Sequence, residues 1–167
     1  MRTLISPLVA VAIVAAAASP AARPTPSFAQ GEQKAAEDPA AFNPMMGALM
    51  NMFIQPRHAR LGIAGRDGNW PLTGYALKEL KESLTKISAA VPRWKGLPVP
   101  DLFDAALTEP MAAIDAAIKA GDQRQFGEAY GQLTAGCNAC HATTDHPFIV
   151  LKAPDASEFP DQEFKPR

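Results

Sequence analysis

Apolar residues recur every three or four positions in four stretches of the chain, the spacing that places them on one face of an α-helix. The first predicted helix begins near Asn43, which is suited to cap it, and has a kink or restart at Pro56. The second begins after Asn69 and ends before Pro92. Its apolar stripe is the clearest in the chain and consists of Leu77, Leu80, Leu84 and Ile87.

A proline-rich connection and a third helix follow. The three prolines from Pro92 to Pro100 predict a crossover loop. Apolar periodicity then continues to Gly121, a residue type that often ends helices. Pro110 lies inside this helix, and Thr108 is placed to recap the chain there, so we expect a bend.

The fourth predicted helix starts at Asp122, and its buried stripe ends in two cysteines and a histidine. That stripe is Phe126, Tyr130, Leu133, Cys137, Cys140 and His141. Beyond Thr144 recurring prolines exclude regular helix, while the run from Phe148 to Leu151 is too apolar to stay in solvent. The sequence therefore predicts an all-α fold, a four-helix up-down-up-down bundle over residues 43–145, with an irregular tail over residues 146–167 packed on it.

The N-terminal 29 residues have the pattern of an export signal. Arg2 gives a positive start, an apolar run covers residues 8–18, and small residues precede a cleavage site after about Ala29. A membrane anchor is the alternative, although the run is shorter than the roughly 20 residues that span a bilayer. Residues 30–42 lack an apolar period and are interpreted as a flexible leader. We therefore expect a periplasmic protein without stable membrane insertion.

Composition and charge narrow the function. Apolar residues make up 47% of the 167 positions but aromatic residues only 7%, a mixture that favours helices over sheets. The chain carries 16 basic and 17 acidic residues, and removing Arg2 and Arg23 with the signal leaves 14 against 17. A mature protein with a net charge of −3 is not expected to bind nucleic acid or anionic lipid.

The fourth helix contains a Cys-X-X-Cys-His motif, formed by Cys137-Asn138-Ala139-Cys140-His141. In such a motif the two thiols attach covalently to the vinyl groups of a haem, and the imidazole is the proximal ligand of its iron. The spacing suits this chemistry because three residues make about one helical turn. A single motif in an exported chain predicts one haem c, with its iron, per chain.

Two other sites were weighed for the cysteine pair. A thioredoxin-like redox site places its cysteines at the start of a helix in a βαβ frame, whereas here they end a helix in an all-helical chain. A structural zinc site would have only His58 and His146 as extra imidazoles and no second cysteine pair. Covalent haem is therefore the preferred interpretation.

Four helices that end in this motif resemble the class II c-type cytochromes, the cytochrome c prime group of periplasmic haem proteins. The chain also resembles a family of short exported bacterial monohaem cytochromes over roughly residues 50–164. Besides the haem motif, the residues that carry this resemblance are Gln55, Arg57, His58, Leu61, Gly65, Asn69, Trp70, Leu72, Tyr75, Leu133, Thr134, Phe148, Ile149 and Val150. Unlike the cytochrome c prime group, this chain continues well beyond its haem histidine, so gas binding is not implied by the resemblance.

Whether a residue binds the iron on its distal side, opposite His141, decides between an electron-carrying and a gas-binding function. In an up-down-up-down bundle, the end of the fourth helix lies beside the start of the first. Candidate distal ligands there are Met46, Met50 and Met52, of which Met50 is preferred. His58 is the other candidate, although it lies about 21 Å along the helix unless the kink folds it inward. Core packing competes with ligation for each methionine, a buried hydrogen-bonded role competes for His58, and His146 is assigned to the tail surface.

Two functions remain. A six-coordinate haem would carry single electrons between redox partner proteins in the periplasm. A five-coordinate haem would bind or sense a small gas such as nitric oxide in a pocket lined by Leu49, Met50 and Phe53. We expect no enzyme activity because no acid–base pair or phosphate loop is evident. Trp70 and Trp94 are assigned to packing, Tyr130 to the core or the porphyrin, and the oligomeric state stays open, a homodimer included.

Overall fold

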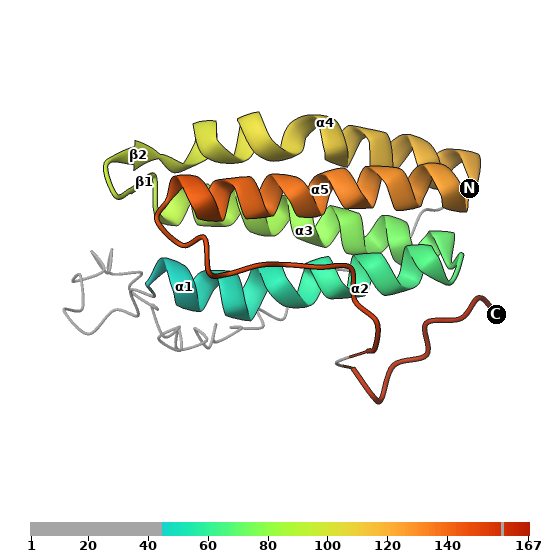
Figure 1. Cartoon of the computed structure of the whole chain (residues 1–167). Coiled ribbons are helices and arrows are strands. Elements are labelled where there is room, and N and C mark those ends of the chain that lie inside the picture. Colours follow the sequence, from blue (N-terminus) through green and yellow to red (C-terminus); the bar gives the residue numbers. More distant parts are fainter. Residues whose placement is uncertain (1–44, 158) are drawn as a thin grey trace, which may run out of the picture. The chain divides into compact units, whose positions relative to one another are not determined.

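The computed structural model of the protein describes residues 45–157 and 159–167 (Figure 1). The expected signal peptide over residues 1–29, the leader over residues 30–42 and the helix start at Asn43 lie outside this part. The helices are α1 (Met46–Leu49), the π-helix η1 (Met50–Ile54), α2 (Gln55–Arg66), α3 (Trp70–Ala90), α4 (Val99–Ala120) and α5 (Gln123–Thr143). α1, η1 and α2 follow one another without a break, so four helical rods pack antiparallel and confirm the predicted all-α bundle.

Pro56 changes the hydrogen-bond pattern of the first rod. A proline has no N–H to donate, and its ring collides with the carbonyl group four residues earlier. The chain accommodates it by widening into η1, after which α2 begins with Pro56 in its first turn. The expected restart is therefore present as a π-helical segment rather than as a break.

The apolar stripes meet in one main core. The four positions predicted in the second helix, Leu77, Leu80, Leu84 and Ile87, are between 2% and 6% exposed. Helices α4 and α5 approach each other closely at Gly136, where a Cβ atom would collide with the carbonyl oxygen of Ala106. Glycine at this position allows the two helices to touch along their backbones.

The connection between α3 and α4 differs from the expected crossover loop. Strands β1 (Arg93–Trp94) and β2 (Leu97–Pro98) pair antiparallel in a tight hairpin. Its two turn residues, Lys95 and Gly96, have φ values of 49° and 80°, as a two-residue hairpin requires. Helix α4 then runs continuously through Pro110, without the predicted recapping at Thr108.

The C-terminal tail is irregular and runs back along the bundle, where it packs against α2 (Figure 1). Arg66 donates to the carbonyl oxygen of Pro154 (3.0 Å), and Asn69 donates to that of Phe164 (3.1 Å). Phe164 is buried in a second small core with Ile63 and Ala64. These contacts hold the far end of the tail on the first rod.

The near end of the tail, from Phe148 to Val150, is more exposed than predicted. Phe148 and Val150 are more than 70% exposed and Ile149 is 45% exposed, although their apolar character predicted burial. Leu151 alone in this run is partly buried. Polar contacts rather than apolar packing hold this stretch against α5, and they belong to the site described next.

Candidate cofactor site

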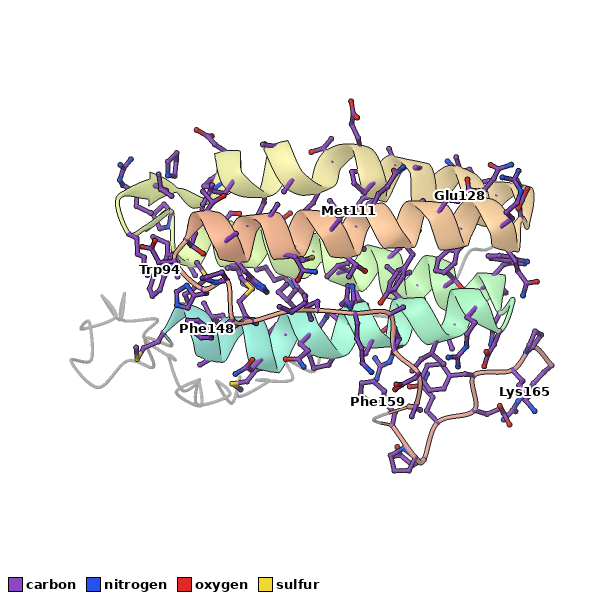
Figure 2. The ribbon with its side chains drawn as sticks, in the orientation of Figure 1. Trp94, Met111, Glu128, Phe148, Phe159 and Lys165 are labelled. Atoms are coloured by element: carbon purple, nitrogen blue, oxygen red, sulfur yellow. The ribbon has the colours of Figure 1, made fainter. Side chains whose placement is uncertain are left out.

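A cavity of about 170 Å³ lies at the end of the bundle where α5 terminates and the first rod begins. Its walls are mostly apolar and come from all the helices, from β1 and from the tail. Met46, Met50 and Ile54 contribute one side, and Ile149 lies at the opening. In Figure 2 the labelled residues Trp94 and Phe148 are at this same end. The cavity brings together residues from both ends of the described chain.

Cys137 and Cys140 lie on the cavity wall in the last two turns of α5 as partly buried free thiols. Burial, reinforced by the neighbouring Cys140 thiol, raises the pKa of Cys137 to about 11. Burial also raises the pKa of Cys140. Both thiols are therefore protonated at neutral pH, the opposite of the low-pKa thiolate that a thioredoxin-like site needs.

The imidazole of His141 lies on the same wall with one nitrogen already engaged. Its Nδ1 is 2.9 Å from the carbonyl oxygen of Ile149, so Nδ1–H donates to that oxygen. A neutral imidazole protonated on Nδ1 presents a lone pair on Nε2. His141 is thereby prepared to bind a metal through Nε2, with the tail carbonyl fixing its tautomer.

His58, one of the two candidate distal ligands, does not line the cavity. It is 2% exposed, and burial lowers its pKa to about 4. Its Nε2 is 3.0 Å from Thr134 Oγ1, and its Nδ1 is 3.0 Å from the hydroxyl of Tyr130. Both ring nitrogens are thus used within the core, and Tyr130 belongs to this network rather than to the cavity wall.

Met50, the other candidate, lies partly buried on the cavity wall, and Met46 lies there as well. Met52 is 56% exposed and does not line it. Of the pocket expected from Leu49, Met50 and Phe53, only Met50 is present: Leu49 turns into the core and Phe53 is 36% exposed. The π-helical turn explains the difference, since it shifts the residues that face the interior.

The structure confirms one of two sequence assignments at the cavity and contradicts the other. Trp94 packs against the core at the end of the bundle, as predicted, and it also lines the cavity there. His146 lines the cavity rather than lying on the tail surface. Its N–H bonds to the carbonyl of His141 (2.8 Å) while Asp145 adopts a left-handed φ of 61°, which is a Schellman motif that folds His146 back beside His141. The sequence signal was weak because Asp rather than Gly occupies the left-handed position.

The groups on the wall match what a covalently held haem requires. Two thiols are spaced by one turn, an imidazole has Nε2 free for iron, and a thioether sulfur lies at Met50, all within apolar surroundings. Within the described residues, no three His, Cys, Asp or Glu side chains form a cluster able to hold a bare metal ion.

No helix in the same residues has the length and apolar character to cross a membrane. Comparison with known proteins adds no relative: no family model, curated protein or solved structure matches the chain.

Proposed function

We propose that this chain is a periplasmic monohaem c-type cytochrome that transfers single electrons between redox partner proteins. The observation that carries the proposal is the Cys-X-X-Cys-His motif on an apolar cavity wall, with His141 held by Ile149 so that Nε2 is free. The four-helix fold, with this motif at the end of its last helix, supports the resemblance to the class II c-type cytochromes.

Cys137 and Cys140 would hold the haem as thioethers. Each thiol adds across one vinyl group: a carbon–sulfur bond forms, the thiol hydrogen goes to the other vinyl carbon, and nothing leaves. His141 would bind the iron through Nε2. When bound, the haem would supply one-electron chemistry between a reduced and an oxidised partner protein.

Met50 is the preferred sixth ligand over His58. Its sulfur belongs to a residue on the cavity wall, whereas both nitrogens of His58 are hydrogen-bonded in the core. Recruiting His58 would break its buried hydrogen bonds to Tyr130 and Thr134, at a cost of about 1 kcal/mol for each bond. Ligation by both His141 and Met50 would favour electron transfer because it would leave no open position for an exogenous ligand.

The first test is covalent attachment. The protein, produced in a host that attaches haem c, is run on a denaturing gel and stained for haem. We expect colour at the monomer band that is lost in the double variant Cys137→Ala, Cys140→Ala. Colour that survives the double substitution, or a colourless wild type, would overturn the proposal.

The second test is ligation, measured by visible spectra of the reduced protein with and without carbon monoxide. We expect the wild type not to bind the gas, Met50→Ala to bind it, and the control Met52→Ala, which alters an exposed methionine outside the cavity, to behave as wild type. Carbon monoxide binding by the wild type would replace the electron-carrier proposal with the gas-binding alternative.

A further inference from the structure

Asn138, the first residue between the two cysteines of the Cys-X-X-Cys-His motif, makes a pair of hydrogen bonds to the tail. Its Oδ1 accepts from the N–H of Leu151 (2.8 Å), and its Nδ2 donates to the carbonyl oxygen of the same residue (3.0 Å). The side chain thus binds the tail as a neighbouring strand would. We call this pair of bonds the Asn138 clasp.

The Asn138 clasp lies next to the bond that orients His141. Asn138 and His141 are three residues apart on α5 and therefore share a face of the helix. Their tail partners, Leu151 and Ile149, are two residues apart, and in an extended chain such residues present their backbone groups to the same side. One short stretch of tail is therefore held to one face of α5 at two successive points.

Few other contacts hold this stretch. The side chains of Phe148 and Val150 are more than 70% exposed and that of Ile149 is 45% exposed, so apolar burial fixes their backbone only weakly. Upstream, the N–H of Ile149 bonds to His146 within the same turn. Downstream, the next hydrogen bond from the bundle to the tail is the one to Pro154. The position of the Ile149 carbonyl therefore depends on the Asn138 clasp.

We propose that Asn138 is a positioning residue for the proximal ligand. By clamping Leu151, it holds the Ile149 carbonyl against His141 Nδ1–H and so fixes the orientation, tautomer and basicity of the imidazole. This inference rests on the proposed function, since it concerns the same iron ligand. A hydrogen bond at the remote nitrogen makes an imidazole a stronger electron donor, which stabilises iron(III) and lowers the reduction potential.

The test compares the wild-type holoprotein with Asn138→Ala, which removes both bonds, and Asn138→Asp, which keeps only the acceptor for the Leu151 N–H. Gln132→Ala is the control because it removes an exposed side-chain amide from the same helix. We expect Leu151 amide hydrogen exchange to accelerate about tenfold in Asn138→Ala. The reduction potential should rise in Asn138→Ala, rise less in Asn138→Asp, and stay unchanged in Gln132→Ala.

A second measurement reports on the imidazole of His141 alone. In ferrous protein carrying Met50→Ala, the iron–histidine stretching frequency in resonance Raman spectra should fall when Asn138→Ala is added. Faster Leu151 exchange with an unchanged potential and frequency would overturn the positioning role, because the clasp would then serve only the tail. Unchanged exchange would overturn the clasp itself. A wild type without covalent haem, in contrast, contradicts the proposed function.

Discussion

Acid should destabilise this bundle through His58, which joins α2 to α5 in the core. The ring is 2% exposed, and burial lowers its pKa from 6.5 to about 4. The unfolded chain therefore binds a proton between these pH values while the folded chain does not. Because the unfolded state holds more protons in this window, the free energy of unfolding must decrease as the pH falls.

The size of the effect follows from the two pKa values. Each unit of difference corresponds to about 1.4 kcal/mol, so the full loss is roughly 3 kcal/mol. Above about pH 6.5 the contribution is fully present. About 2 kcal/mol is lost by pH 5, and the effect levels off once the pH is below about 4. For a domain of this size such a change is a large part of a typical stability of 5–15 kcal/mol.

Urea unfolding followed by circular dichroism at several pH values between 7.5 and 4.5 measures this loss. His58→Gln is the matched variant, since an amide can hydrogen-bond to Tyr130 and Thr134 but does not titrate. The variant should start less stable and lose about 2 kcal/mol less than the wild type on going to pH 5. Parallel pH dependences of the two proteins would refute the argument that His58 is buried in its neutral form.

Three further predictions concern stability and are measured by the same unfolding curves. Gly136→Ala should destabilise the protein by about 2 kcal/mol or more because its methyl group would collide with Ala106, whereas Gly131→Ala, with open space around it in the same helix, should stabilise it by up to about 1 kcal/mol. Tyr130→Phe should cost about 1–3 kcal/mol by leaving the buried ring nitrogen unpaired. Asp122→Ala should cost about 1 kcal/mol by removing the cap of α5. Equal effects of the two glycine substitutions, or wild-type stability in either of the other variants, would contradict the respective contacts.

Periodic features of the sequence predicted the fold well because each depends on neighbours along one helix. The stripe from Leu77 to Ile87 and the cap at Asp122 are of this kind. The β-hairpin was missed because Lys95, rather than Asn or Asp, precedes Gly96 in a left-handed conformation.

Features that depend on distant segments could not be predicted in the same way. Whether Met50 or His58 reaches the cavity depends on the register of η1 and on partners of His58 more than seventy residues away. The Asn138 clasp needs a tail whose path no local pattern specifies, and the sequence therefore predicted no contact for the Asn138 side chain.

The cavity is assembled from residues near both ends of the described chain, and this determines when it can form. Residues between Met46 and Gln55 meet residues between Cys137 and Leu151, and the 81 residues from 56 to 136 lie between these two segments. Closing so long a loop is entropically costly and is repaid only by late, non-local contacts. If the chain holds the proposed haem, the two thiols and the imidazole would therefore be accessible to an attachment enzyme until these late contacts form.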